Sequence, residues 1–144
     1  MAKTIESVMT RDVEVINPND TVREAAEKMA TLNVGPIPVC DGQRILGMIT
    51  DRDIVVRVIA KGLDPNVTRV ADAMTANVEY CFMDDDIRTV LQHMADKQVR
   101  RLIVVDHSKK LVGIVALGDL SQEASEREAG EALESISEPS APLH

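Results

Sequence analysis

Few side chains in this sequence have the types and spacing needed for chemistry, and the main ones lie at the start of a predicted helix. Thr50 and Asp53 stand three residues apart, with Asp51 between them. A carboxylate can accept hydrogen bonds from two neighbouring hydroxyls, and bonds to a charged group contribute about 1.5 to 3 kcal/mol each. Free backbone N–H groups at a helix start also favour a bound anion. The negative charge of Asp51 would oppose such an anion unless the Asp51 side chain points away from it.

The same two residues also fit a capping box. In that arrangement Thr50 is the N-cap and Asp53 takes the place of the usual Glu or Gln. Capping boxes are common, so this motif alone does not separate a ligand contact from an ordinary helix start.

Motifs that catalysis usually requires are absent from the sequence. It has no P-loop, no Gly-x-Gly-x-x-Gly, no Gly-x-Ser-x-Gly and no cluster of Cys or His. His93 and His107 lack a matched partner, which favours surface roles over metal binding or catalysis. Cys40 and Cys81 stand in separate strand-like segments and are expected to be reduced core thiols. We therefore expect no enzyme activity, no metal and no catalytic cofactor.

Composition and charge narrow the class of protein further. The 144 residues carry a net charge of −8, which disfavours binding to nucleic acid or to a membrane surface. No apolar run is long enough to span a membrane, and the first residues lack the apolar stretch of a signal peptide, so we expect the cytoplasm. Tyr80 and Phe82 are the only aromatic residues, so aliphatic side chains must form the core. A chain of this length can bury one sizeable core or two very small ones, so any repeat inside it is expected to share its core.

An internal repeat is the main organising feature. A shift of 65 residues superposes residues 8–10 on 73–75, and beyond residue 41 a shift of 66 superposes residues 47–54 on 113–120. The second copy keeps Asp119 but has Ala116 in place of Thr50. Because alanine caps poorly, at a cost near about 1 kcal/mol, capping alone does not explain the retained Asp119. The second site is also expected to be the weaker one.

Each copy is predicted to form a β-α-β-β-α unit. The pattern predicts strands at residues 13–16 and 78–82, helices starting near Thr21 and residue 87, and strand pairs at residues 37–40 with 45–50 and 102–105 with 111–115. The closing helix of the first copy starts at Asp51 and is expected to bury Ile54, Val55, Val58 and Ile59 before it stops at Gly62. The closing helix of the second copy starts near Leu117 and is expected to fray into a mobile acidic tail.

So small a unit cannot cover its own sheet, so the two copies should pack around a pseudo-twofold axis with a ligand cleft between them. The expected divisions are a first repeat at residues 1–66, a second repeat at residues 67–125, and an acidic helix end with a mobile tail at residues 126–144.

These features together resemble the cystathionine-β-synthase (CBS) domain pair, or Bateman module, over residues 5 to about 122. The resemblance is carried by residues 8–10 and 73–75, by residues 33–39 and 98–104, and by the Gly-x-x-Thr-x-x-Asp segment at 47–53. Residues 50–55 and 62–65 are especially similar to stand-alone bacterial members of the family. The resemblance implies an α/β (α+β) fold and clefts for adenosine-containing ligands, such as AMP, ADP, ATP, NAD or S-adenosylmethionine.

The family pattern also implies roles for individual residues. Asp53 would bind the ribose hydroxyls and Thr50 the ribose or phosphate, while Arg101, or its neighbour Arg100, would bind phosphate and complete the pocket that holds Thr50 and Asp53. Surface positions at a strand start are the alternative for both arginines. Asp119 is a less secure contact than Asp53. The expected contact set also contains Thr10, Val13, Val34, Gly35, Pro36, Ile37, Pro38, Asn77, Val78 and Val99.

The resemblance favours a regulatory protein that binds an adenine nucleotide such as AMP, ATP or NAD, and whose state is read by an unidentified protein partner. It also implies a homodimer, for which the apolar faces with Val55, Val58 and Ile59, or with Leu120 and Ala124, could serve. The alternative is a ligand-free scaffold whose nucleotide sites have decayed, as the change to Ala116 suggests, and whose acidic tail contacts a partner.

Overall fold

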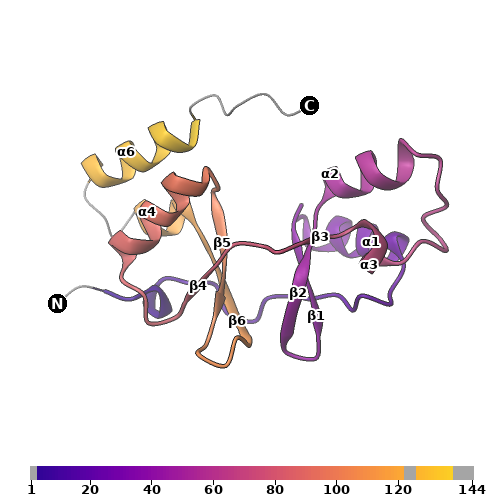
Figure 1. Ribbon diagram of the computed structural model, residues 1–144, viewed down its shortest axis with the longest axis horizontal. Helices are drawn as coiled ribbons and strands as arrows, with labels where there is room; N and C mark the ends of the chain where they lie inside the picture. The colour runs from indigo at the N-terminus through magenta and orange to yellow at the C-terminus, as the bar shows by residue number, and fades with distance from the viewer. Residues whose placement is uncertain (1–2, 122–125, 138–144) are drawn as a thin grey trace. The chain divides into compact units, whose positions relative to one another are not determined.

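Two three-stranded sheets organise the chain, which a computed structural model describes at residues 3–121 and 126–137 (Figure 1). Each sheet belongs to its own compact unit. Unit 1 consists of Met1–Val13, Glu79–Ser108 and Val112–His144, and unit 2 consists of Glu14–Val78 with Lys109–Leu111. The mixture of helices with two small sheets confirms the predicted α+β class.

Unit 2 contains an antiparallel sheet in the order β1-β2-β3. Its strands are β1 (Ile37–Asp41), β2 (Arg44–Ile49) and β3 (Thr75–Ala76). Its helices are α1 (Val22–Leu32), α2 (Asp51–Ile54), which continues into the π-helical turn η2 (Val55–Ile59), and α3 (Val70–Ala73).

Unit 1 contains a sheet in the order β4-β5-β6. Its strands are β4 (Tyr80–Phe82), which runs parallel to β5 (Arg101–Val105), and β6 (Leu111–Ala116). The helices are the 3₁₀ turn η1 (Ile5–Ser7), α4 (Ile87–Lys97), α5 (Leu117–Ser121) and α6 (Glu126–Ser137).

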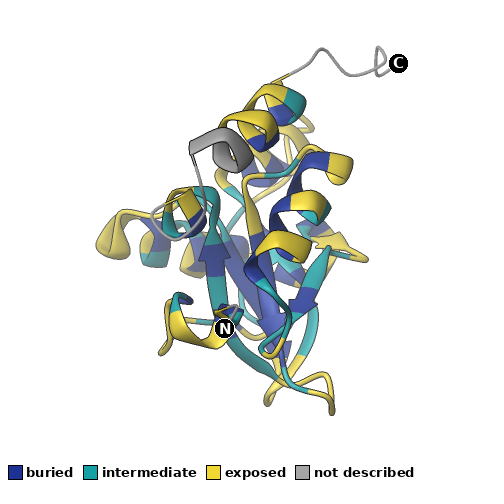
Figure 2. Ribbon diagram, turned by 90° about the vertical axis from the view of Figure 1, so that its left-hand side faces the viewer, coloured by how far each residue is buried: buried dark blue, intermediate teal, exposed yellow. Residues whose placement is uncertain are grey.

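Local sequence signals explain where the two long predicted helices begin and which face they bury. Thr21 caps α1 by accepting a hydrogen bond from the backbone N–H of Glu24, and Asp86 caps α4 by accepting one from Arg88. Each helix is buried along one side and exposed along the other (Figure 2). All five apolar positions predicted for the second of these helices are buried, namely Ile87, Val90, Leu91, Met94 and Ala95.

The repeat in the sequence recurs as a repeat of backbone contacts. Thr75 pairs with Met48 in unit 2, and Thr10 pairs with Ile114 in unit 1, which are the positions that the shifts of 65 and 66 relate. In the same way, the N–H of Val70 donates to the carbonyl of Asp20, and that of Ile5 donates to Asp85. The N-terminal segment of each repeat therefore completes the sheet of the other repeat's unit.

Each unit has its own hydrophobic core, so the chain forms the two small cores that its length allowed, and the repeats share both of them. The core of unit 1 takes Ile5 and Met9 from the start of the chain, and the core of unit 2 takes Val70 and Ala73 from the start of the second repeat. Because each repeat supplies apolar side chains to both cores, two small cores are closed where a single repeat could not close one.

Three sequence expectations differ from the structure. Residues 13–16 do not form a strand. Among them only Ile16 is buried, and it makes a single isolated parallel bridge to Val39. In the helix after Asp51 the core-facing row is Ile54 and Val58, so the expected burial of Val55 and Ile59 was wrong; these two residues are 57% and 55% exposed.

The third difference concerns the acidic C-terminal segment. Residues 126–137 form the helix α6, in agreement with the expected helix end, but Ala132 and Ile136 of this helix join the core cluster of unit 1, which the sequence reasoning did not anticipate. Residues 138–144 lie outside the described residues. Among the helices that the structure describes, none is both long and apolar enough to cross a membrane.

Candidate functional site

The helix start at Thr50 forms a complete capping box in unit 2. The hydroxyl of Thr50 accepts a hydrogen bond from the N–H of Asp53 at 3.0 Å, and Asp53 Oδ2 accepts one from the N–H of Thr50, also at 3.0 Å. This geometry fixes the Asp53 side chain against the end of β2. The predicted pair is therefore brought together, and its capping role accounts for part of its hydrogen bonding.

Two further side chains contact the Asp53 carboxylate. The hydroxyl of Thr75, in β3, donates to Oδ1 at 3.2 Å and lies 3.4 Å from Oδ2. Arg57 Nε lies 3.8 Å from Oδ1, while Arg57 Nη1 donates to the carbonyl of Met74 at 2.9 Å. Both residues were missing from the predicted set.

Asp53 is the only buried charged residue in the described part of the chain, with 8% of its surface exposed. Burying a charge is costly unless hydrogen bonds and opposite charge compensate for it. Here a backbone N–H, a hydroxyl and a guanidinium supply that compensation. A carboxylate has about four acceptor positions, so the side chain is oriented and still has room for further donors.

The mid-unit segment of each repeat contacts the start of the closing helix in the same unit. The N–H of Asp51 donates to the carbonyl of Gly35 at 3.2 Å, and the N–H of Leu117 donates to the carbonyl of Arg100 at 2.8 Å. A Cβ at Gly35 would come within 3.2 Å of Asp51 Oδ1, so this carboxylate lies over the glycine. The equivalent backbone contact therefore involves the acidic residue Asp51 in unit 2 and the basic residue Arg100 in unit 1.

Asp119 retains half of the capping box in unit 1. Its Oδ2 accepts a hydrogen bond from the N–H of Ala116 at 3.0 Å, as Asp53 does from Thr50. This bond needs no side chain at position 116. Asp119 therefore has a structural role without a threonine at position 116, because its carboxylate caps a backbone group that alanine also has.

Arg100 and Arg101 line a cavity of about 460 Å³ in unit 1. The other lining residues come from the end of β6, from α5 and from α6, and they are Ala116, Leu117, Gly118, Ser121, Gly130 and Leu133. Both arginines are exposed, and neither has an ion pair within the part of the chain that the structure describes. The lining is otherwise uncharged, so this cavity favours an anion.

Comparison with known proteins identifies the family. A model of the CBS domain matches residues 5–60 and again residues 70–126. This chain belongs to the CBS domain family. The protein YlbB of Bacillus subtilis is 46% identical over 137 residues, which cover 93% of this chain and 91% of YlbB. Hypoxic response protein 1 of Mycobacterium tuberculosis is 32% identical over 139 residues, which cover 96% of each chain.

Solved CBS structures share the fold. The crystal structure of Hypoxic Response Protein I with two coordinated zinc ions has a TM-score of 0.76 at 33% identity, and covers 85% of this chain and 99% of that one. The structure of CBSX2 in complex with AMP has a TM-score of 0.72 at 25% identity, and covers 83% of this chain and 94% of that one.

The predicted ligand contacts of this CBS pair divide between the units. Unit 2 holds Val34, Gly35, Pro36, Ile37, Pro38, Thr50, Asp53, Asn77 and Val78, and unit 1 holds Thr10, Val13, Val99, Arg100, Arg101 and Asp119. Ile37 and Pro38 are buried in β1, so only backbone groups of these two residues are suited to ligand contact. Asn77 adopts a left-handed backbone with φ of 56°, as its repeat counterpart Asp12 does with φ of 54°.

His93 and His107 each have an acidic partner, which the sequence interpretation did not expect. His93 Nε2 lies 2.9 Å from Glu79 Oε2, and His107 Nε2 lies 2.8 Å from Asp84 Oδ2. The His107 ring also stacks on Phe82 with ring centroids 5.0 Å apart. Hydrogen bonding with Asp84 raises the pKa of His107, and the bond from His107 lowers the pKa of Asp84.

The two cysteines are free and buried. Burial raises the pKa of the Cys40 thiol to about 11 and that of the Cys81 thiol to about 12. Both are poor nucleophiles because so little thiolate forms near neutral pH. Within the described residues, no group of three or more His, Cys, Asp or Glu could hold a metal ion.

Proposed function

We propose that this CBS pair is a regulatory protein that binds an adenine nucleotide and does not catalyse a reaction. The observation that carries the proposal is the Asp53 carboxylate, which is buried yet held in place by Thr50, Thr75 and Arg57. A fixed carboxylate of this kind can accept both vicinal hydroxyls of a ribose without paying to order itself on binding.

Family membership supports an adenosine-containing ligand. The related CBSX2 was crystallised with AMP, and this chain resembles it over 83% of its length. We propose that Asp53 and Thr50 bind the ribose, that backbone at residues 34–38 and 99–103 contacts the base, and that Arg101 or Arg100 binds phosphate. Thr10, Val13, Asn77 and Val78 belong to the same proposed set of ligand contacts, and Asp119 marks a weaker second site.

A thermal-shift panel tests the proposal. AMP, ADP, ATP, NAD and S-adenosylmethionine are each added to the wild type and to Asp53→Asn, which keeps the size of the side chain. A ligand at about 100 times its dissociation constant stabilises a protein by about 2.7 kcal/mol. We expect one or more nucleotides to raise the Tm of the wild type and to have much less effect on the variant. A flat response by the wild type to every ligand would reject nucleotide binding.

The second candidate is a ligand-free scaffold of the same family. The complete capping box favours it, because Thr50 and Asp53 already have a structural role without any ligand. If the protein is such a scaffold, Asp53→Asn lowers the Tm to the same extent with and without nucleotide. The acidic C-terminal segment then contacts a protein partner. The panel above separates the two candidates.

We also propose a homodimer formed through exposed apolar side chains of η2. Val55, Val56 and Ile59 are 57%, 46% and 55% exposed. Val58 and Leu120, which the sequence also suggested for an interface, are fully buried and excluded from it, and Ala124 lies outside the described residues. The double variant Val55→Asp, Ile59→Asp should sediment as a monomer where the wild type sediments as a dimer. A monomeric wild type would reject the dimer.

The proposal places the protein in the cytoplasm, which supplies adenine nucleotides and keeps thiols reduced, in agreement with two free cysteines. An unidentified protein partner would read the ligand-dependent state. Such a readout requires that the ligand bind one arrangement of the protein more tightly than another.

A further inference from the structure

Arg57 is the contact of the Asp53 carboxylate that capping explains least. The side chain comes from the π-helical turn η2, one turn after Asp53, and its Nε lies 3.8 Å from Asp53 Oδ1. That separation is too long for a hydrogen bond. Asp53 already accepts bonds from the N–H of Thr50 and the hydroxyl of Thr75. Pairing with Asp53 therefore does not by itself account for the position of Arg57.

A neutral backbone group holds the guanidinium in place. Arg57 Nη1 donates to the carbonyl of Met74 at 2.9 Å, and Met74 directly precedes Thr75, whose hydroxyl contacts Asp53. Because a carbonyl carries no net charge, this bond orients the arginine without neutralising it. Asp53, Thr75 and Arg57 thus form one connected cluster within unit 2, drawn from α2, β3 and η2.

Part of the guanidinium remains available to a further partner. An arginine has five N–H groups. Nε adjoins Asp53 and Nη1 donates to Met74, whereas Nη2 has no partner in the part of the chain that the structure describes. The Arg57 side chain is 45% exposed, so a ligand can reach it. A guanidinium matches the oxygens of a phosphate both in geometry and in charge.

The acidic residue Asp51 does not offset this positive charge. Its carboxylate lies over Gly35, where a Cβ would come within 3.2 Å of Asp51 Oδ1. Residues two apart on a helix do not face each other, so Asp51 and Asp53 lie on different sides of α2. The side of the helix that carries Asp53 therefore also carries a cation, Arg57, beside the carboxylate.

The second copy lacks this cation. The shift of 66 residues aligns Arg57 with Glu123, which has the opposite charge. Asp119, the counterpart of Asp53, accepts a hydrogen bond from the N–H of Ala116 and forms no ion pair within the described residues. Among those residues, a positive group beside the capping carboxylate is found in unit 2 alone.

We propose that Arg57 selects the ligand of the Asp53 site by the charge of the group at the 5′ position of the ribose. When Asp53 binds the 2′- and 3′-hydroxyls, the 5′ substituent is carried by the same ring and lies within reach of the adjoining guanidinium. A phosphate there gains charge-assisted hydrogen bonds. The positively charged sulfonium of S-adenosylmethionine is repelled instead.

The Asp53 site therefore takes nucleoside 5′-phosphates in preference to nucleosides and to sulfonium nucleosides. This inference rests on the proposed binding of the ribose by Asp53, and it names the class of ligand and the residue that selects it.

Isothermal titration calorimetry on the full chain tests the inference with AMP, adenosine and S-adenosylmethionine, in the wild type and in Arg57→Gln. The wild type should prefer AMP to adenosine by roughly ten- to hundredfold, the range for one hydrogen bond to a charged group, and should bind S-adenosylmethionine no better than adenosine. In Arg57→Gln the preference for AMP should fall by at least about tenfold. The ratio of two affinities in one protein cancels any general damage to the Asp53 site.

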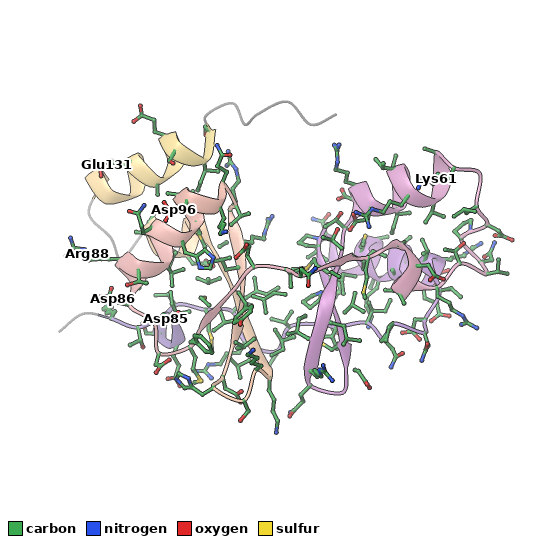
Figure 3. All side chains as sticks on the ribbon, viewed as in Figure 1. Lys61, Asp85, Asp86, Arg88, Asp96 and Glu131 are labelled. Atoms are coloured by element: carbon green, nitrogen blue, oxygen red, sulfur yellow. The ribbon has the colours of Figure 1, made fainter. Side chains whose placement is uncertain are left out.

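Two further variants serve as controls. Arg57→Lys keeps the positive charge and should keep most of the preference for AMP. Lys61 is exposed and follows the same helical segment (Figure 3). It lies about 12 Å along the helix axis from Asp53, at about 1.5 Å per residue, which is farther than the Debye length of about 8 Å. Lys61→Gln should therefore keep the full preference, and an equal loss in Lys61→Gln and Arg57→Gln would overturn the inference.

Failure of the inference can be told apart from failure of the proposed function. If the ligands bind but the preference for AMP is the same in Arg57→Gln as in the wild type, the inference is overturned while the binding of an adenosine-containing ligand stands. Binding of S-adenosylmethionine to the wild type as tightly as AMP has the same meaning. If none of the three ligands binds, both are overturned.

Discussion

At the residue scale, Asp53 combines two roles in one carboxylate. Oδ2 accepts the capping bond from the N–H of Thr50, and both oxygens are close to the hydroxyl of Thr75. Capping fixes where the side chain points, and burial removes competing water from it. The structural role and the proposed ligand role therefore support each other, because a carboxylate that is already ordered loses little entropy when a ribose binds.

Replacing Thr75 tests how far Asp53 depends on its neighbours. Thr75→Val keeps the shape of the side chain but removes the hydroxyl that donates to Asp53, and a hydrogen bond of this kind contributes about 0.5 to 1.5 kcal/mol, or about two- to tenfold in affinity. We expect weaker AMP binding by calorimetry in Thr75→Val and near wild-type binding in Thr75→Ser. Unchanged or tighter binding in Thr75→Val would show that the hydroxyl does not position the carboxylate.

The His107–Asp84 pair predicts a pH effect at a single residue. The bond to Asp84 raises the pKa of His107. The pair therefore stabilises the fold in full at pH values below the ordinary pKa of histidine, about 6.5. This contribution is lost as the pH rises through the raised pKa of His107. The lowered pKa of Asp84 gives the acidic limit, because the contribution is lost as the pH falls through that value. NMR titration should give His107 a pKa above the ordinary value in the wild type, and a lower one in Asp84→Asn. The same titration curve in both proteins would refute the pairing.

Sequence reasoning found Thr50 and Asp53 but not Thr75 or Arg57. The repeat contained a signal for Thr75, since it aligns with Thr10, yet the alignment does not say which carboxylate its hydroxyl meets. Arg57 lies one helical turn after Asp53, a spacing that allows an ion pair but is too common to indicate one.

At the element scale, two glycines allow the close pairing that completes each sheet. A Cβ at Gly47 would lie 2.5 Å from the carbonyl oxygen of Thr75, and one at Gly113 would lie 2.8 Å from that of Thr10. These glycines are equivalent in the repeat. They are needed because the segment from the other repeat passes directly against the strand.

Substitution of these glycines should therefore weaken the sheets. Gly47→Ala forces β2 and β3 apart at a backbone contact, and overpacking of this kind costs about 1 to 3 kcal/mol. Gly118→Ala is the control, since an added Cβ there meets nothing within 4 Å. Urea unfolding should show a clear loss of stability for the first variant and little change for the second. Equal stability of the two variants would mean that the close approach is not strained.

The long helices and hairpins could be predicted because their signals are local. Apolar periodicity with a capping residue located α1 and α4, and the paired apolar runs located β1 with β2 and β5 with β6. The two-residue β3 and the four-residue α3 were missed, because neither is long enough to show a period and β3 pairs with a strand some distance away in the sequence. The apolar side chains after Asp51 cover a wider part of the helix surface than the part that packs on the core. Val55 and Ile59 lie outside that packed part and are exposed.

At the scale of the whole molecule, the compact units do not follow the repeat boundaries proposed at residues 1–66 and 67–125. Glu14–Val78 lies within unit 2, together with Lys109–Leu111, whereas residues 1–13 belong to unit 1. The shift of 65 residues revealed two equivalent copies but could not show that each exchanges its first segment with the other. The exchange leaves the local sequence pattern of each copy unchanged. It changes only which copy the first segment of each repeat packs against.

Fragments of the chain test this exchange. A fragment of residues 14–78 retains Val70 and Ala73, which are 0% and 1% exposed in the core of unit 2, whereas a fragment of residues 1–66 lacks both. Burial of a Val side chain alone contributes about 1.5 to 3 kcal/mol. We expect fragment 14–78 to show a cooperative thermal transition by circular dichroism and fragment 1–66 to show none. A transition in fragment 1–66 at the same temperature would contradict the assignment.

Binding of the ribose by Asp53 is tested most directly by comparing AMP with 2′-deoxy-AMP by isothermal titration calorimetry, in the wild type and in Asp53→Asn. If the Asp53 carboxylate binds the ribose, the wild type should prefer AMP by roughly tenfold, the effect of one hydrogen bond to a charged group. The preference should largely disappear in the variant. Binding of AMP and 2′-deoxy-AMP with equal affinity by the wild type, or the same preference in both proteins, would contradict the account.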